Sequence, residues 1–481
     1  MFTLLFTALT LAGAGDGLPV KAPRTVGMSA ERLRKIDHVI ERGISAGGYP
    51  GAAVVVGRKG AAVWEKGFGR LSWSRDDAPV VAERTIYDLA SLTKVVGTTT
   101  AIMVLFDQGK LSLDDPVAKY VPEFSGGGKE LVTVRLLLEH RSGLPAGRDL
   151  WRIARTPEEA RQAVIQTPLE CAPGQCYIYS DLGADMLAFV AEAASGQRLD
   201  MFLQQNVFSP LGMNDTFFRP ADSLSGRIAP TEVNPPRGYP LRGEVHDENA
   251  FALGGVAGHA GLFSTAADLS VFAQMMLNGG EYNGVRVISD STVDLFTKRA
   301  AGTRALGWDT CGGSGSCGQY LGEDAYGHTG FTGTSIWIDP ERDMFVVLLT
   351  NRVHAARARR PAKVISDVRA DLADAAALAV LDHGDVLEMP AKFRADRAVG
   401  WNGRERAARS RSSRHHVSAK SKKSASHKST AKPAGSRVAS AKKATSRVTT
   451  SNGSIARASS KASSGRKPAT AHKKTSSKSR R

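Results

Sequence analysis

Ser91 and Lys94 lie three residues apart in the segment YDLASLTKVVGTTT, where an apolar stretch begins. On an α-helix this spacing places both side chains on one face, about one turn apart. A serine at a helix N-terminus meets free N–H groups and the partial positive charge of the helix. Burial would lower the pKa of Lys94 and would allow it to deprotonate a serine hydroxyl. The pair therefore predicts a nucleophilic serine with a lysine base.

The Ser-x-x-Lys spacing alone is not specific, because it occurs three more times in the polar C-terminal sequence. Two further segments give it a context. The stretch PGQCYIYSDLGADML places Tyr179-Ser180-Asp181 before a predicted helix, and AYGHTGFTGTSIWID places His328-Thr329-Gly330 before a predicted strand.

In this order the three segments resemble the serine β-lactamase and penicillin-binding-protein superfamily, and they are most similar to its class C-like branch. The pattern of that family is S-x-x-K, then Y-x-N, then K-T-G or H-x-G. The flanking stretches TVRLLLEHRSGLP, LGGVAGHAGLFSTAADLSVFAQMML and GFTGTSIWIDPERDMFVVLLTNR are also similar to it. The resemblance covers about residues 28–380 and implies the β-lactamase/DD-peptidase fold.

The resemblance also implies a role for each matched residue. Ser91 would attack an acyl carbon and become acylated, and Lys94 would help to deprotonate it. Tyr179 would be a second acid–base group, which moves protons to the leaving group and from the hydrolytic water. The main-chain N–H groups of Ser91 and Phe331 would form an oxyanion hole, in which two fixed donors stabilise developing charge. The substrate pocket would be lined by Asp181, His328, Thr329, Gly330 and Phe331.

Two positions depart from the family pattern. Asp181 stands where the family has Asn, and an ionised Asp can accept hydrogen bonds but cannot donate one. Its carboxylate could also pair with Lys94 and raise the pKa of that base. His328 stands where many members have Lys, and a neutral His holds a substrate carboxylate less firmly. Both departures argue against efficient β-lactam hydrolysis and suit a carboxypeptidase, amide hydrolase or ester hydrolase.

Other histidines suggest alternative sites. His140, His246 and His259 could supply a Ser-His-Asp arrangement, but each lies beside Gly or charged residues, and we expect structural roles. The run His246-Asp247-Glu248 could suggest a metal site, but no partner His follows at helical spacing. We therefore expect neither a metal nor an organic cofactor.

The elements that must position these residues form an α+β pattern. Alternating and apolar runs predict β-hairpins over residues 51–69 and 334–351. Helices are expected from Ser29 and from Pro361 to Leu381. Further helices are predicted for the stretches VVGTTTAIMVLFDQG, TVRLLLEH, ADMLAFVAEAASG, LDMFLQQNVFSPLG and AADLSVFAQMMLNGG. The hairpins would share one antiparallel sheet, flanked by helices and interrupted by an inserted helical region.

The ends of the chain differ from its centre. Residues 1–14 resemble a secretory signal peptide, and residues 15–28 would be a leader into a hydrolase domain at residues 29–381. No other apolar run is long enough to predict a transmembrane anchor. Residues 401–481 hold 23 of the 64 Lys and Arg residues and a single acidic residue. Residues 382–481 are therefore predicted to be a disordered linker and basic tail.

The four cysteines form two close pairs, Cys171 with Cys176 and Cys311 with Cys317. In an exported chain such pairs predict two local disulfides, whereas in a cytosolic chain they would be free thiols. Metal binding by these pairs would require more ligands nearby.

Together these features predict an exported serine hydrolase, periplasmic or secreted, whose substrate is a peptidoglycan stem peptide or a D-amino-acid amide. β-Lactams are candidate acylating agents. The alternatives are a short-chain esterase that uses the same machinery and an inactive wall-binding protein. The tail would bind an anionic envelope polymer by charge or would be a solvated tail with no dedicated partner, and nucleic acid is the weakest candidate for a main partner.

Overall fold

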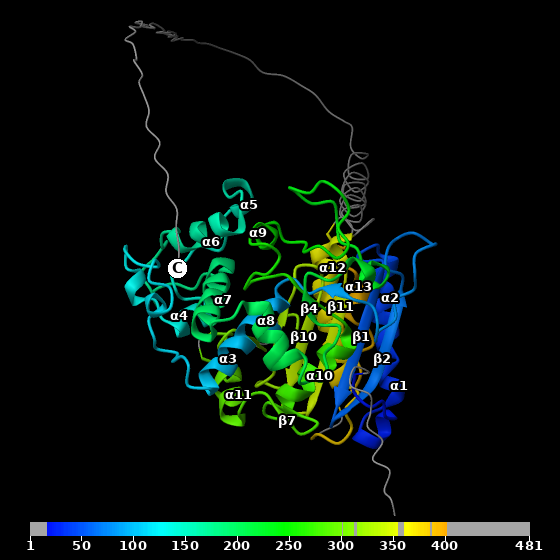
Figure 1. Ribbon diagram of the computed structural model, residues 1–481. Helices are drawn as coiled ribbons and strands as arrows, with labels where there is room; N and C mark the ends of the chain where they lie inside the picture. Colours follow the sequence, from blue (N-terminus) through cyan, green and yellow to red (C-terminus); the bar gives the residue numbers. More distant parts are fainter. Residues whose placement is uncertain (1–16, 301, 312–314, 355–359, 385–386, 402–481) are drawn as a thin grey trace, which may run out of the picture. The chain divides into compact units, whose positions relative to one another are not determined.

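The computed structural model describes residues 17–300, 302–311, 315–354, 360–384 and 387–401. Its main element is an antiparallel sheet of six strands in the order β2-β1-β11-β10-β9-β8 (Figure 1). The strands are β1 (Gly51–Arg58), β2 (Ala61–Gly69), β8 (Asp309–Thr310), β9 (Tyr326–Thr329), β10 (Ser335–Asp339) and β11 (Met344–Thr350).

The pairing of β1 with β11 joins the two ends of the domain. Val55 of β1 lies opposite Val347 of β11, and both strands are buried along their whole length. Successive side chains of a strand point to opposite faces, so a strand between two helical layers must be apolar at nearly every position. Both strands meet this condition, and the predicted α+β architecture with one shared sheet is confirmed.

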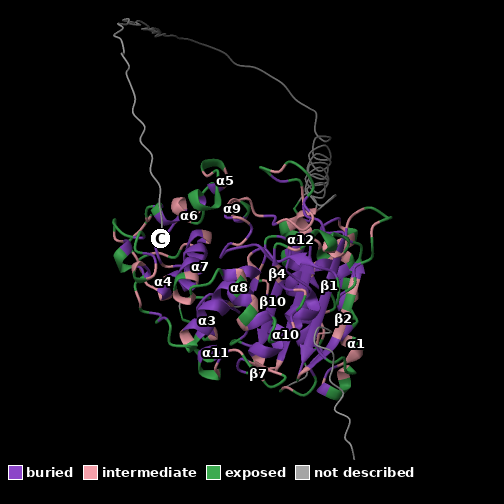
Figure 2. Ribbon diagram, in the orientation of Figure 1, coloured by how far each residue is buried: buried purple, intermediate pink, exposed green. Residues whose placement is uncertain are grey.

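Helices α2 (Lys35–Ser45) and α12 (Pro361–Ala377) cover one face of the sheet, and their inner sides are buried (Figure 2). Val54 of β1 and Val346 of β11 pack with them in one apolar cluster. Helix α12 was predicted to continue to Leu381 but ends at Ala377.

The opposite face is covered by α10 (Ala266–Leu277), and the inserted helical region lies beyond it (Figure 1). Val55 and Val347 point to this side and belong to a second, larger apolar cluster that continues into the helices. Their alternation with Val54 and Val346 is the period of two that a strand imposes.

The helix predicted after Lys94 is present, but its first part is wider than an α-helix. Residues Thr93–Thr99 form π-helical turns, which are followed by α3 (Thr100–Asp107). The hydroxyl of Thr100 donates to the carbonyl of Val95 at 2.8 Å within this wider segment. Single π-turns inside helices are frequent at functional sites.

Most of the remaining elements are short, and most of them lie in the helical region. The helices are α1 (Ala30–Leu33), α4 (Val134–Leu138), α5 (Leu150–Ile153), α6 (Pro157–Gln166), α7 (Asp181–Ser195), α8 (Leu199–Leu203), α9 (Glu248–Ala252), α11 (Asp290–Thr297) and α13 (Arg394–Arg397). A three-stranded sheet has the order β3-β5-β4, with β3 (Tyr87–Asp88), β5 (Leu262–Ser264) and β4 (Phe217–Phe218). A two-stranded ribbon contains β6 (Glu281–Tyr282) and β7 (Val285–Arg286).

The packed region extends beyond the predicted boundaries of residues 29 and 381. On the N-terminal side Leu18 is buried, and Met28 forms a β-bridge with Val380. On the C-terminal side Phe393 and Trp401 are buried against the cluster of α2 and α12. The predicted linker from residue 382 is therefore wrong as far as residue 401, because its few large apolar side chains complete the core. The predicted signal peptide and basic tail lie outside the described residues.

Both predicted disulfides are present, Cys171–Cys176 and Cys311–Cys317. Among the described residues, no helix is both long enough and apolar enough to cross a bilayer.

Candidate active site

The chain makes a constrained turn immediately before Ser91. Ala90 adopts a φ of 47°, a left-handed conformation that is uncommon for a residue with a Cβ. Its N–H donates to the buried carboxylate of Asp88 at 2.8 Å. Backbone strain of this kind persists only where the surroundings impose it, and it is often found at functional sites. The turn places Ser91 at the start of the helical segment that carries Lys94.

Lys94 is buried, with 3% of its surface exposed, and its ammonium contacts three acceptors. The Nζ atom lies 3.2 Å from Ser91 Oγ and 3.1 Å from the carbonyl oxygen of His259. It also forms an ion pair of 2.7 Å with Asp181. An ammonium has three protons to donate, and these contacts share them with a further hydrogen bond to Tyr179.

The charge of Lys94 is set by opposing effects. Burial lowers its pKa, but electrostatic interactions and hydrogen bonds with Tyr179 and Asp181 raise it, and the net pKa lies above the ordinary value. Lys94 is therefore protonated in this arrangement. The pairing with Asp181 that the sequence suggested is present, and it opposes a base role until the ammonium loses a proton.

Tyr179 lies over Lys94 at the start of α7. Its ring centroid is 5.1 Å from the Lys94 ammonium and 4.7 Å from the ring of His140. His140 accepts a hydrogen bond from the N–H of Ser180 at 3.1 Å through Nδ1. Ser180 caps α7 by accepting from Gly183 N–H at 3.0 Å. His140 thus holds the chain around Tyr179 and does not contact Ser91.

The connection between β9 and β10 is tied to the turn before Ser91. The hydroxyl of Thr332 donates to the carbonyl of Asp88 at 2.7 Å, and that of Thr334 donates to the carbonyl of Leu89 at 2.9 Å. These bonds bring Phe331 to the cavity that Ser91 also lines. Within the described residues, the N–H groups of Ser91 and Phe331 have no hydrogen-bond acceptor. Two unused donors at one cavity match the needs of an oxyanion hole.

The cavity at Ser91 has a volume of about 370 Å³. It is lined by Ser91, Tyr179, His328, Thr329, Gly330 and Phe331, together with Arg304, Asp309, Arg352 and Arg369. Each pocket residue expected from the sequence therefore lies in this wall except Asp181, which reaches the site through Lys94.

His328 is neutral in this wall. Burial, with the positive charges of Arg304 and Lys94, lowers its pKa well below the ordinary value. Its Nδ1 lies 2.9 Å from the carbonyl of Thr329, so this nitrogen carries the proton. Although Nε2 lies 4.0 Å from Asp309, a neutral ring forms no ion pair there.

Arg304 is the main residue of the cavity that the sequence did not indicate. Its guanidinium pairs with Asp309 at 2.8 Å and donates to the Tyr177 hydroxyl at 2.9 Å. It also lies 5.2 Å from the ring centroid of Tyr179. Its Nη1 is buried and has no acceptor among the described residues. A buried guanidinium with a free donor is suited to an anionic group of a ligand.

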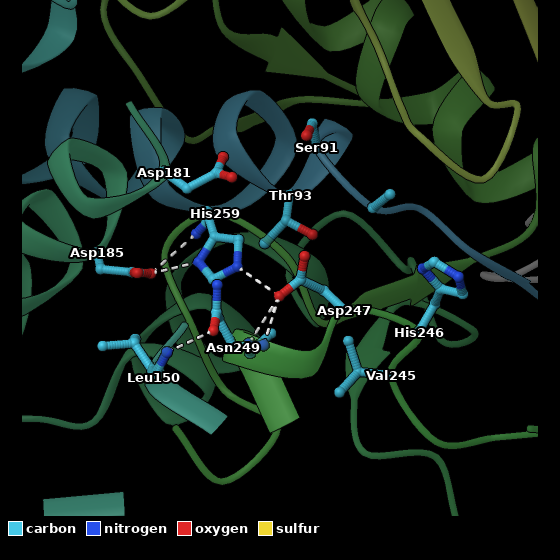
Figure 3. Close-up of polar contacts among 12 residues, drawn as sticks. Ser91, Thr93, Leu150, Asp181, Asp185, Val245, His246, Asp247, Asn249 and His259 are labelled. Atoms are coloured by element: carbon cyan, nitrogen blue, oxygen red, sulfur yellow. Dashed lines mark hydrogen bonds and ion pairs between the residues drawn. The ribbon is translucent and has the colours of Figure 1, made fainter. Parts of the chain in front are cut away.

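The alternative histidine sites have other partners. His246 lies 2.9 Å from Glu232. His259 lies between Asp185 and Asp247, as Figure 3 shows. Neither ring contacts Ser91. Among the described residues, no cluster of three or more His, Cys, Asp or Glu side chains could hold a metal ion.

A larger cavity of about 700 Å³ lies apart from these residues. It is lined by side chains of α5, α9 and the loop before α9, including Trp151, Tyr239 and Phe251. Because it lacks Ser91, Lys94 and Tyr179, its size does not make it the candidate active site.

Two relatives align with most of the chain. A protein from Escherichia coli (strain K12), provisionally named D-alanyl-D-alanine carboxypeptidase, is 35% identical over 399 residues, which cover 74% of this chain and 91% of that protein. An N-acetylmuramyl-L-alanine amidase from Bacillus subtilis (strain 168) is 35% identical over 372 residues, which cover 69% and 83%.

Solved structures share the fold at lower identity. The octameric penicillin-binding protein homologue from Pyrococcus abyssi has a TM-score of 0.56 at 23% identity, over 69% of this chain and 75% of that chain. EstCE1, described as a hydrolase with promiscuous acyltransferase activity, has a TM-score of 0.59 at 22% identity, over 72% and 99%. A family model described as Beta-lactamase matches residues 36–370. With its three motifs gathered at one cavity, this chain belongs to the β-lactamase family.

Proposed function

We propose that the protein is a serine hydrolase of the class C-like type, which works through an acyl-enzyme on Ser91. The observation that carries this proposal is the contact of 3.2 Å between Ser91 Oγ and Lys94 Nζ, with Tyr179 stacked over that ammonium. A nucleophile, a proton acceptor and a second acid–base group within reach of one cavity are the parts that acyl transfer needs.

The contacts support a specific order of proton transfers. Solvent takes one proton from the Lys94 ammonium, and the resulting amine accepts the proton of Ser91 as Oγ attacks the acyl carbon. The N–H groups of Ser91 and Phe331 stabilise the oxyanion of the tetrahedral intermediate. Tyr179 then gives its proton to the leaving group.

Hydrolysis of the acyl-enzyme reverses these transfers. Tyr179 recovers its proton from the water that attacks the acyl carbon. When Ser91 leaves, Oγ takes a proton from Lys94, and Lys94 recovers its own from solvent. One water is consumed, and every side chain returns to its first state.

The cavity wall supports a substrate with a negative charge near the scissile bond. Arg304 and Arg352 bring two guanidinium groups to the same cavity as Ser91. A terminal carboxylate of a peptidoglycan-type peptide, or of a D-amino-acid amide, would meet that charge. The names of the carboxypeptidase and amidase relatives support amide bonds of the cell wall as substrates.

The proposal is tested by intact-mass analysis after exposure to fluorophosphonate, penicillins, D-Ala-D-Ala peptides and p-nitrophenyl esters. The expected result is one covalent adduct on Ser91 that is absent in Ser91→Ala. An adduct that persists in this variant would overturn the assignment of the nucleophile. Turnover of esters without turnover of any peptide would favour the short-chain esterase.

We also propose export and an electrostatic role for the tail. The two disulfides suit an oxidising compartment, and the basic composition of residues 401–481 suits an anionic envelope polymer. Deletion of residues 402–481 is expected to leave turnover of small substrates intact and to abolish salt-sensitive retention on cell envelopes. Retention that survives the deletion would contradict this role.

A further inference from the structure

His259 lies between two carboxylates, next to the helical segment that follows Ser91 (Figure 3). Its Nδ1 is 2.7 Å from Asp185 and its Nε2 is 2.9 Å from Asp247. The histidine is 2% exposed and the side chain of Asp185 is wholly buried. Ionised carboxylates only accept hydrogen bonds, so both ring nitrogens must donate and the ring is an imidazolium.

The charges in this cluster are mutually stabilising. Burial alone would lower the pKa of His259, but Asp185 and Asp247 outweigh burial and raise it well above the ordinary value. Burial would raise the pKa of Asp247, but His259 and the N–H groups at the start of α9 lower it below the ordinary value. Further titratable groups interact with this cluster. The ammonium of Lys94 contacts the main chain of His259, and Asp88 and His246 interact electrostatically with Asp247.

The same cluster fixes the main chain that Lys94 contacts. One oxygen of Asp185 accepts from the N–H groups of Gly258 and His259 at 3.0 and 3.3 Å. The hydroxyl of Thr98 donates to the carbonyl of Gly258 at 2.7 Å. The carbonyl of His259, which accepts from Lys94 Nζ at 3.1 Å, is therefore held from both sides.

Helix α7 carries both a carboxylate that contacts His259 and the carboxylate that pairs with Lys94. Asp181 and Asp185 lie four residues apart on α7 and so occupy one face of it. Asp181 contacts the ammonium, and Asp185 contacts the residue whose carbonyl accepts from that ammonium. Asp247 anchors the other side of the ring and is itself fixed because it caps α9.

We propose that His259, bridged between Asp185 and Asp247, is a positioning residue that holds Lys94 against Ser91 through its own main-chain carbonyl. This inference rests on the proposed function, since it assigns a partner to the base of that reaction. It accounts for a buried Asp-His-Asp cluster that contacts neither Ser91 nor the cavity. A misplacement of about 1 Å in a reacting group costs on the order of a hundredfold in rate.

The test separates the bridge from the cap of α9. In Asp247→Ser the hydroxyl keeps the cap but is too short to reach His259, whereas Asp247→Asn keeps both the cap and a hydrogen bond to the ring. We expect Asp247→Ser to lower the maximal rate of fluorophosphonate labelling at Ser91 on the order of tenfold with unchanged probe affinity. Asp247→Asn is expected to restore most of that rate.

A matched control is Asp371→Ser. Asp371 is also buried, accepts from the N–H groups of Arg394 and Ala395 at 3.0 and 2.6 Å, and pairs with the Arg394 side chain at 3.0 Å. It has no contact with Lys94, so its loss should lower the melting temperature without changing the labelling rate.

The outcomes are distinct. A normal labelling rate in Asp247→Ser, or equal slowing in Asp247→Ser and Asp247→Asn, would overturn the bridging role while leaving the proposed hydrolase intact. If the wild-type protein itself gave no adduct on Ser91, the proposed function would fail, and the bridging role would fail with it.

Discussion

The ammonium of Lys94 and the carboxylate of Asp181 form an ion pair of 2.7 Å beside Ser91. Lys94 is almost fully buried, whereas the Asp181 side chain is 33% exposed. The carboxylate stands at the position where the family pattern has the neutral amide of Asn. It therefore changes the charge of the site without changing the size of the side chain.

Replacement of Asp181 by Asn should lower the pKa of Lys94. The carboxylate is one of the charges that raise this pKa, and its loss leaves burial, which lowers it, opposed mainly by Tyr179. More of the amine is then neutral at a given pH, so the acidic limb of the pH–rate profile for penicillin acylation should move to lower pH. On that limb, a tenfold larger acid dissociation constant of Lys94 gives roughly tenfold more of the neutral amine.

The control is Asp185→Asn, which alters a buried carboxylate on the same helix that contacts His259 and not Lys94. Its acidic limb should move less than that of Asp181→Asn. A profile that is unchanged in Asp181→Asn would mean that Lys94 is not the group that limits acylation.

The sequence could predict site residues in two ways, by local geometry within one element and by the family motifs that supplied Tyr179, His328 and Phe331. Ser91 and Lys94 are one turn apart on the same helix, so their contact follows from local geometry. Arg304 and His259 could not be found in this way, because their partners lie on other elements and meet them only through tertiary packing. Likewise the buried Trp401 lies in a polar stretch whose average composition conceals a single anchoring side chain.

Removal of the Tyr179 hydroxyl should affect amides more than activated esters. In Tyr179→Phe an amine leaving group has no proton donor, whereas p-nitrophenolate can leave without one. We expect the rate of amide hydrolysis to fall by about 10² to 10⁴ and the acylation burst with p-nitrophenyl esters to fall much less. Equal losses for the two substrate types, measured by stopped-flow burst kinetics, would argue against this acid role.

Replacement of Arg304 by Gln should weaken binding of substrates with a free carboxylate. The change removes the charge beside Ser91, and a hydrogen bond to a charged group contributes about 1.5–3 kcal/mol. KM for a D-Ala-D-Ala peptide should therefore rise on the order of tenfold to a hundredfold. The comparison is with the matched amide-capped peptide, whose KM should change little.

The control for Arg304 is Arg161→Gln, which breaks an ion pair of 2.8 Å with Glu192 between α6 and α7, away from the cavity. It should leave both KM values unchanged. If Arg304→Gln changes KM equally for the free and the amide-capped peptide, the guanidinium does not bind the substrate carboxylate.

Truncation should distinguish the packed C-terminal segment from the tail. A chain that ends at residue 401 keeps Trp401, whose ring is buried beneath α12 and donates to Asp367 at 2.7 Å. A chain that ends at residue 381 loses Trp401 and Phe393, and loss of one large buried aromatic side chain typically costs about 3–5 kcal/mol. The shorter chain should therefore unfold at a clearly lower urea concentration than the chain ending at 401, which should match the full-length protein.

The single variant Trp401→Ala in the full chain should reproduce most of this loss, since the defect lies in the core and not in chain length. Equal urea midpoints for all four proteins would instead show that the fold is complete at residue 381.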